Sequence, residues 1–356
     1  MNKDELRDVE ENVIGFEALY DSMMKCKRNV MWKDSVAHYY LNAIEETIRL
    51  EEQLKKGTYK AKKPVVFTVT SPKRREIVSI SFRDRIYQRS LNDNAIYPQM
   101  SKSFIYDNAA CQKDKGTDFA RRRLKCFLQR YYRKYGTNKG YVLQCDIHGY
   151  YPNMRHDVAV ETFRRGLDPW TFEAAKKVLE DQYEGDTGYN PGSQMIQIAG
   201  ISVLNRLDHT IKEDLQMEYY PRYMDDFLLV DPAEQRLEHG KERIEKELNS
   251  TGFELNEKKT RIYPLSKGIK YLGFWFYLTD TGKVVMLLDS KNVKRERKKL
   301  YRLVAKAKRG EITKEKVDHC YAGWRNHAEK GDSKVLLRNM DEYYNSLWKG
   351  VPQNAF

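Results

Sequence analysis

The chain has 356 residues, 40% of them hydrophobic and 32% charged, a composition that excludes a disordered protein. Its 64 Lys and Arg against 51 Asp and Glu give a net charge of +13 and a pI near 9.2. This surplus favours a polyanionic partner, because basic side chains that neutralise phosphates release counterions. The 25 Tyr add rings that can stack on bases.

Cysteine use and hydropathy indicate the compartment. The five cysteines are scattered and never form a CxxC pair, which argues against a zinc site or a disulfide framework. The first residues are polar and mixed in charge, unlike a signal peptide. No uncharged apolar run approaches the ~20 residues of a membrane-spanning helix. We therefore expect a cytoplasmic protein that does not engage a membrane.

Hydrophobic periodicity and turn residues predict the elements in chain order. Residues 1–56 read as helical, and Gly57 ends that run. The β-rich segments 65–69 and 77–80 flank the basic segment 71–75 and predict a hairpin. Further helices are expected at 84–94, 117–134, 157–184, 194–216 and 234–250, strands at 141–145, 261–264 and 269–277, and a hairpin over 219–230 that turns at Met224 and Asp225. After residue 288, basic residues crowd one helix, which indicates a separate helical subdomain with a basic face.

Acidic residues stand at the ends of two apolar strands. Asp225 and Asp226 precede the apolar segment 227–230, where charge is costly unless it is paired, solvated or bound to a metal. A solvated Asp-Asp turn is the ordinary alternative. Asp146 ends the apolar strand 141–145 upstream, and three such carboxylates together would form an all-oxygen site suited to Mg²⁺. Two such ions hold the attacking 3′ oxygen and the leaving pyrophosphate oxygen in phosphoryl transfer.

The order of short motifs along the chain resembles that of reverse transcriptases. The similarity begins at 73–77 and 83–85, in the fingers of the family, and covers roughly 60–345. The further motifs are Asp146-(x)4-Tyr151, Gly192-(x)4-Gln197, Tyr223-Met224-Asp225-Asp226, Leu255-Asn256-Glu257-Lys258-Lys259-Thr260 and Tyr271-Leu272-Gly273-Phe274. Among subgroups the chain is similar to bacterial, non-retroviral enzymes: those of diversity-generating retroelements, group II introns, retrons and the unassigned defence-associated group.

The resemblance implies roles for the residues that carry the chemistry. Asp146, Asp225 and Asp226 would bind two Mg²⁺ ions, for which Mn²⁺ could substitute. The backbone carbonyl of Ile147 would add to the metal shell and lie at the nucleotide. Lys259 would protonate the departing pyrophosphate as a general acid.

The resemblance also implies substrate contacts. Tyr151 would be the aromatic gate that excludes a ribose 2′-hydroxyl; the alternative is a core ring, a role that suits the neighbouring Tyr150 better. The remaining nucleotide-binding residues would be Lys73, Arg75, Arg83, Gly192 and Gln197, although the first three could be solvated hairpin charges. Tyr271, Leu272 and Gly273 would grip the primer terminus, with a plain strand turn as the alternative.

The sequence departs from the family pattern around Gly192. Pro191 stands where these enzymes usually have Gln or a close equivalent, and Ile196-Gln197 stands where they have Ser-Pro. Gln197 is similar to the Ser-Gln of diversity-generating and defence-associated enzymes, but Ile196 breaks that pair. Neither the usual retron thumb motif nor a maturase or endonuclease extension after Phe356 is seen, so we do not expect a group II intron protein.

The expected fold is α+β, a right-hand polymerase with fingers, an antiparallel palm sheet backed by helices, and a C-terminal helical thumb. The predicted boundaries are 1–140 for the N-terminal helices and fingers, 141–285 for the palm (with fingers and palm helices at 155–190) and 286–356 for the thumb.

The expected function is RNA-directed DNA polymerase in a bacterial cytoplasm, serving phage defence or a diversity-generating retroelement. Expected partners are an RNA template (a dedicated non-coding RNA), the DNA product and dNTPs; an accessory protein or self-association stays open. One alternative is an RNA-directed RNA polymerase, which usually has Gly-Asp-Asp and an acid in place of Tyr151. Another is an inactive RNA-binding relative, which the intact acids disfavour, because clustered carboxylates without metal repel one another.

Overall fold

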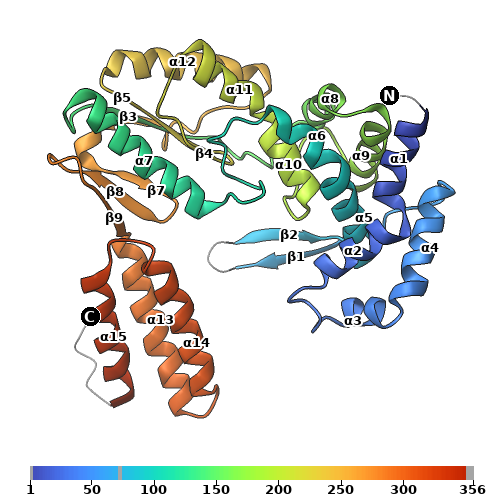
Figure 1. Ribbon diagram of the computed structural model, residues 1–356. Coiled ribbons are helices and arrows are strands. Elements are labelled where there is room, and N and C mark those ends of the chain that lie inside the picture. Colours follow the sequence, from blue (N-terminus) through green and yellow to red (C-terminus); the bar gives the residue numbers. More distant parts are fainter. Residues whose placement is uncertain (1–2, 71–73, 350–356) are drawn as a thin grey trace. The chain divides into compact units, whose positions relative to one another are not determined.

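The computed structural model describes residues 3–70 and 74–349 and divides the chain into two compact units (Figure 1). Unit 1 comprises Met1–Ala120, Leu143–Leu229 and Glu238–Arg261, and unit 2 comprises Arg121–Val142, Val230–Leu237 and Ile262–Phe356. The chain therefore passes from one unit to the other several times.

Unit 1 begins with four helices, which confirms the helical character expected up to Gly57. They are α1 (Lys3–Ile14), α2 (Phe16–Cys26), α3 (Asp34–Leu41) and α4 (Ala43–Lys55). Gly57 has a φ of +66°, a left-handed conformation that glycine adopts at little cost. Helix α4 ends just before it.

The hairpin expected around residues 71–75 is confirmed. Strand β1 (Val65–Val69) pairs antiparallel with β2 (Arg75–Ser79), so that Val65 lies opposite Ser79. Residues 71–73, at the predicted basic tip, lie outside the described residues. The hairpin is followed by α5 (Phe82–Leu91), a π-helical turn η1 (Asn92–Ile96), α6 (Tyr97–Met100) and a 3-10 turn η2 (Ser101–Ser103).

A four-stranded sheet in the order β4-β5-β3-β6 carries the acidic residues. The strands are β3 (Tyr141–Asp146), β4 (Arg222–Tyr223), β5 (Asp226–Asp231) and β6 (Arg261–Pro264). In β5 the run 227–230 is buried throughout, which explains its continuous apolar sequence. The helices between and after the strands are α7 (Thr117–Tyr135), α8 (His156–Gly166), α9 (Pro169–Gln182), α10 (Gln194–Val203), α11 (Asn205–His209), the π-helical turn η3 (Thr210–Asp214) and α12 (Glu234–Ser250).

Two helices expected as continuous are divided. The predicted helix 157–184 breaks before Pro169, where Asp168 caps α9 by accepting a hydrogen bond from the Thr171 N–H. Proline lacks the backbone donor that an unbroken helix needs at that position, but it fits the first turn of a new one. The predicted helix 194–216 is likewise split after Val203.

Unit 2 contains a second antiparallel sheet and three final helices. The sheet runs β7 (Ile269–Tyr271), β8 (Phe274–Leu278), β9 (Val284–Leu288), preceded by the 3-10 turn η4 (Leu265–Lys267) and followed by α13 (Ser290–Lys308), α14 (Lys314–Ala328) and α15 (Lys334–Lys349). The single strand expected over 269–277 is wrong, because a tight turn at Leu272 and Gly273 divides it; β9 was not expected. The surplus of basic residues lies in unit 2, and α13 confirms the expected basic helix.

Antiparallel pairing together with segregated helices confirms the expected α+β class. None of the described helices is long and apolar enough to cross a bilayer. The three-part division into fingers, palm and thumb stays a prediction.

Candidate active site

Strand β3 delivers Asp146 to the site. Its residues Val142, Leu143 and Cys145 are buried, and their packing holds the strand in the core. Asp146 is the last residue of the strand and is half-buried. Beyond it, Ile147 forms an antiparallel bridge with Leu255. The Asp146 carbonyl accepts a hydrogen bond of 2.7 Å from the Asn256 N–H, and this pairing ties the strand end to the following motif.

The expected turn at Met224 and Asp225 is confirmed. In the hairpin, Arg222 lies opposite Phe227 and Tyr223 opposite Asp226, so only Met224 and Asp225 form the loop. Met224 has a φ of +57°. This region is unfavourable by about 1–2 kcal/mol for a residue with a Cβ, so the surroundings must hold the turn in place.

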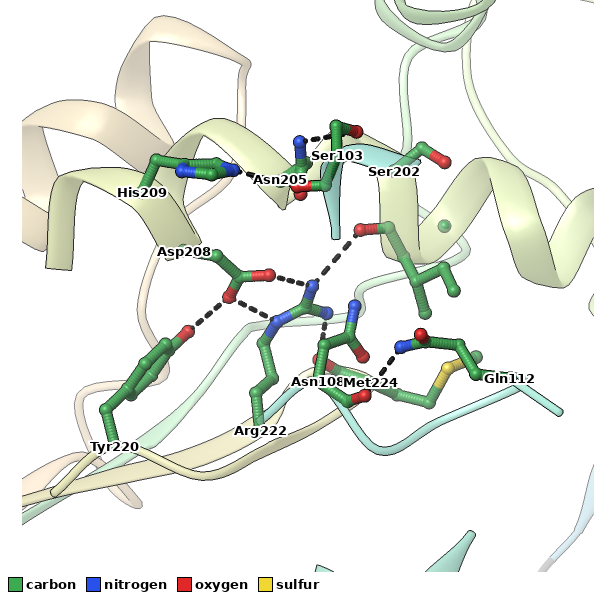
Figure 2. Close-up of polar contacts among 12 residues, drawn as sticks. Ser103, Asn108, Gln112, Ser202, Asn205, Asp208, His209, Tyr220, Arg222 and Met224 are labelled. Carbon is green, nitrogen blue, oxygen red and sulfur yellow. Dashed lines mark hydrogen bonds and ion pairs between the residues drawn. The ribbon is translucent and has the colours of Figure 1, made fainter. Parts of the chain in front are cut away.

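Arg222 is the residue that holds it, as Figure 2 shows. Its guanidinium donates to the Met224 carbonyl at 3.0 Å and to the carbonyl of Ile201 in α10 at 3.2 Å. The backbone of Arg222 also pairs with the neighbouring segment, accepting from the Ala109 N–H at 2.9 Å and donating to the Asp107 carbonyl at 3.1 Å. The turn at Met224 and Asp225 is thus fixed to α10 and to the 107–109 segment through the side chain and the backbone of Arg222.

The charge of Arg222 is balanced by Asp208 of α11. The guanidinium contacts both carboxylate oxygens, with Nε donating to Oδ1 at 2.6 Å, and the Tyr220 hydroxyl donates to the same oxygen at 2.6 Å. Both charged side chains are fully buried. The sequence analysis missed this pair. An arginine inside an apolar strand signals a buried partner, but nothing in the spacing points to Asp208.

Three carboxylates come together at the turn. Burial raises the pKa of Asp225, and the nearby charge of Asp146 raises it further. Burial, followed by the charges of Asp225 and Asp146, raises the pKa of Asp226 to about 7. These mutual effects mean that the carboxylates are near enough to repel one another through a poorly solvated space.

The donor set fits divalent cations. Within the described parts of the chain, no group of three or more His, Cys, Asp or Glu side chains is arranged so that it could hold a metal ion, and the fit to a cation is therefore one of donor chemistry. The half-buried carboxylates of Asp146, Asp225 and Asp226 nevertheless concentrate negative charge that a divalent cation would offset, and all their donor atoms are oxygens, which Mg²⁺ prefers. These residues are therefore suited to hold Mg²⁺ or Mn²⁺.

Lys259 provides the positive charge at the site. Its ammonium group lies 2.9 and 3.0 Å from the two carboxylate oxygens of Asp146 and lowers the pKa of Asp225 and Asp226. The lysine stands on a turn in which the Lys259 and Thr260 N–H groups donate to the Asn256 carbonyl. The Thr260 hydroxyl in turn accepts from the Asp146 N–H at 3.4 Å. The predicted general acid is thus positioned directly on the predicted metal ligands.

The two adjacent tyrosines have different environments. Tyr150 is a core ring, 3% exposed, and its hydroxyl donates to the Gly200 carbonyl. Tyr151 is half-buried and packs against Tyr150 edge to face. Burial raises the pKa of its hydroxyl, and the charge of Asp225 raises that pKa further. The predicted gate therefore lies within electrostatic range of Asp225.

The adjacent residues Ile196 and Gln197, which stand where the family has Ser-Pro, have different environments in α10. Ile196 is fully buried, whereas Gln197 is half-exposed and donates to the Pro191 carbonyl at 2.9 Å. The side-chain oxygen of Gln197 accepts a hydrogen bond from the Cys111 thiol. The sulfur of Cys111 lies 3.9 Å from the sulfur of Met224. Gln197 and Cys111 line a cavity of about 260 Å³ next to the turn. Gly192 precedes the helix, where a side chain would lie 3.2 Å from the Val78 carbonyl of β2.

The predicted triphosphate contacts have mixed outcomes. Lys73 lies outside the described residues, and Arg75 is defined only through its backbone, which pairs with Val69. The guanidinium of Arg83 donates to the Gln53 side chain at 2.9 Å and to the Lys60 carbonyl at 2.6 Å. These bonds hold Arg83 against Gln53 and Lys60, and its contact with a nucleotide stays a prediction.

The predicted primer grip is a tight turn in unit 2. Leu272 and Gly273 have φ values of +44° and +88° between the paired strands β7 and β8. The Leu272 carbonyl accepts from Arg121 at 3.1 Å, and Tyr271 is buried. A plain strand turn and a primer grip share this geometry, so the function stays a prediction.

Of the comparisons with known proteins, the match to a family model agrees with the motif order. A family model described as "Reverse transcriptase (RNA-dependent DNA polymerase)" matches residues 60–276, which contain the whole candidate site. Apo telomerase from Candida tropicalis, truncated from its C-terminal domain, is similar with a TM-score of 0.48 and 13% identity, covering 68% of this chain and 60% of that chain. Telomerase from Candida albicans, in complex with the TWJ fragment of telomeric RNA, is similar with a TM-score of 0.48 and 12% identity, covering 74% and 55%. The chain thus spans less than two thirds of the length of these structures. Among curated proteins no sequence matches.

Proposed function

The chain belongs to the reverse transcriptase family, a membership that confirms the expected right-hand polymerase fold, and on this basis we propose that it is an RNA-directed DNA polymerase. The observation that carries the proposal is the electrostatic convergence of Asp146, Asp225 and Asp226 within unit 1. Carboxylates kept this close in a half-buried turn destabilise the fold, and bound divalent cations would offset their mutual repulsion.

In this proposal the three aspartates, with the Ile147 carbonyl, hold two Mg²⁺ or Mn²⁺ ions. Such ions stabilise the charge on the attacking and leaving oxygens of phosphoryl transfer. Lys259 donates a proton to the departing pyrophosphate, and its contact with Asp146, one of the proposed metal ligands, supports this role.

Recognition of substrate is assigned to the surrounding residues. Tyr151 selects the deoxyribose, and its position within electrostatic range of Asp225 supports that role. The nucleotide is bound by Lys73, Arg75, Arg83, Gly192 and Gln197, and the primer end is held by Tyr271, Leu272 and Gly273. The template is an RNA, here proposed to be a dedicated non-coding RNA, and the basic surplus of unit 2 supports contact with nucleic acid.

The biological setting follows from the resemblance to bacterial enzymes. We assign the chain to phage defence or to a diversity-generating retroelement, acting in the cytoplasm. The departures at Pro191 and Ile196 favour defence. An RNA-directed RNA polymerase is the competing activity, and the aromatic ring at Tyr151, where such enzymes carry an acid, speaks against it.

Primer extension tests the proposal. Purified protein is given an RNA template with a DNA or RNA primer, dNTPs or NTPs, with Mg²⁺ or with EDTA. We expect extension that requires dNTPs and a divalent cation and disappears in Asp225→Asn. Extension with NTPs in preference to dNTPs would assign the RNA polymerase activity instead. Cation-dependent RNA binding without any extension would identify an inactive relative.

A further inference from the structure

Gly200 occupies an unusual position in the middle of α10. The helix runs from Gln194 to Val203, and Gly200 is fully buried within it. Glycine in a helix interior is about 0.5–1 kcal/mol less stable than alanine. A buried helical glycine therefore indicates that something nearby needs the space of the missing side chain.

The group that needs this space is the ring of Tyr151. A Cβ atom on Gly200 would lie 2.7 Å from the Tyr151 hydroxyl oxygen, 3.1 Å from Cζ and 3.2 Å from Cε1. Real Cβ atoms essentially never approach other heavy atoms within 3.0 Å. The phenol end of Tyr151 thus rests directly on bare helix backbone. The Tyr150 hydroxyl, which donates to the Gly200 carbonyl, holds the same point of the helix from the neighbouring ring.

The hydroxyl of Tyr151 is buried and has no hydrogen-bond partner in the described part of the chain. An unsatisfied buried hydroxyl costs about 1–3 kcal/mol. Its contact with α10 is therefore steric: the end of the ring lies against Gly200, and α10 sets how far the ring can withdraw.

We propose that Gly200 is a positioning residue for the sugar gate. The proposal rests on the function assigned above, because it takes Tyr151 as the group that faces the nucleotide sugar. The gate then has two parts, the ring of Tyr151 and the side-chain-free segment of α10 behind it. Any side chain at position 200 pushes the ring away from α10 and into the space left for the deoxyribose.

A set of four variants tests this inference. Gly200→Ala is expected to raise the KM for dNTPs about fivefold to tenfold with a smaller change in kcat, since displacements well below 1 Å suffice to impair alignment. Tyr151→Phe alone provides the reference dNTP KM against which the double variant is compared. The double variant Tyr151→Phe/Gly200→Ala should recover most of the loss, because the closest contact, at 2.7 Å, belongs to the oxygen that phenylalanine lacks.

Gly240→Ala is the matched control. Gly240 is also a buried glycine inside a helix of unit 1, but its Cβ would meet only the flexible end of Met217 at 3.3 Å. We expect this variant to keep the wild-type KM and the wild-type ratio of dNTP to NTP use.

The outcomes separate the two proposals. A wild-type enzyme that prefers NTPs overturns the proposed function itself. A wild-type enzyme that prefers dNTPs, combined with an unchanged KM in Gly200→Ala, overturns the positioning role alone. Equal loss of kcat with both nucleotide types and no recovery in the double variant would reduce Gly200 to a packing residue and also overturn it. If Gly200→Ala does not fold, the double variant is compared with Tyr151→Phe. A dNTP KM of the double variant that is more than about threefold higher than that of Tyr151→Phe would contradict the steric explanation.

Discussion

Arg222 and Asp208 form a fully buried, bidentate ion pair, and the same guanidinium donates to the carbonyl of Met224 in the turn before Asp225. Removing one partner of such a pair leaves an uncompensated buried charge. The pair also links α10, α11 and the catalytic hairpin through one side chain. The turn therefore depends on a residue whose own side chain is fully buried.

We predict that Arg222→Lys destabilises the protein by about 1–3 kcal/mol, because one ammonium cannot serve two carboxylate oxygens and two carbonyls, and at least one buried acceptor loses its partner. Arg222→Ala should cost about 3–5 kcal/mol. Urea denaturation measures both. The control is Arg164→Lys, an exposed partner of Glu161, for which no measurable change is expected. A lysine variant as stable as wild type would contradict the account.

Asp226→Asn should abolish activity and yet stabilise the protein without divalent cations. The pKa of Asp226 is raised to about 7 by burial and by its acidic neighbours, so the folded chain binds this proton more tightly than the unfolded chain does. The free energy of unfolding of the wild type therefore falls as pH rises from about 4 to 7, and the uncharged side chain of Asp226→Asn does not show that loss. One pKa unit corresponds to ~1.4 kcal/mol; because the site is half-exposed, we expect a gain of only about 1–2 kcal/mol at pH 8.

Thermal unfolding of wild type and Asp226→Asn at pH 5 and pH 8 checks this prediction. The difference between the two should be small at pH 5 and clear at pH 8. A constant difference across that range would mean that the charge of Asp226 is not the source of the instability.

Divalent cations should raise the melting temperature of the wild type and not that of Asp225→Asn. Ligands that bind only the folded state stabilise it in proportion to their occupancy. Because protons compete for Asp226, more Mg²⁺ should be needed for half-maximal stabilisation at pH 6 than at pH 8. Titration of Mg²⁺ followed by thermal unfolding tests this without any need for polymerase activity.

Lys259→Met should lower kcat by about 10²-fold or more while leaving the dNTP KM near wild type, as expected for a lost general acid. It should also shift the pH profile of the remaining activity upward, since Lys259 lowers the pKa of both Asp225 and Asp226. Lys258→Met, at the exposed neighbouring position, is the control. A loss confined to KM would assign Lys259 to binding instead.

The features that follow from local sequence were predictable. Asp225 and Asp226 precede a continuous apolar strand, and this pattern alone places them at a strand end with a tight turn before it. Asp146 was found for the same reason. The motif order then supplied their common function, and the structure adds their electrostatic contact.

The features that depend on distant contacts were not predictable. Leu272 is a poor turn residue, yet it adopts a positive φ with its carbonyl held by Arg121, a residue far away in sequence. Periodicity therefore read 269–277 as one strand. The partner of Arg222 and the glycine behind Tyr151 likewise depend on tertiary neighbours, which spacing along the chain does not encode.

The interleaving of the two units has a practical consequence for dissecting the protein. Segments 121–142 and 230–237 belong to unit 2 but are inserted between segments of unit 1. No single cut in the chain releases the acidic centre as one continuous fragment of unit 1 alone. A truncation after residue 261 keeps both inserted segments but removes the rest of unit 2, against which they fold. Attempts to isolate a minimal catalytic piece should therefore yield insoluble or unfolded material, and circular permutation or loop replacement at these junctions is the more promising route.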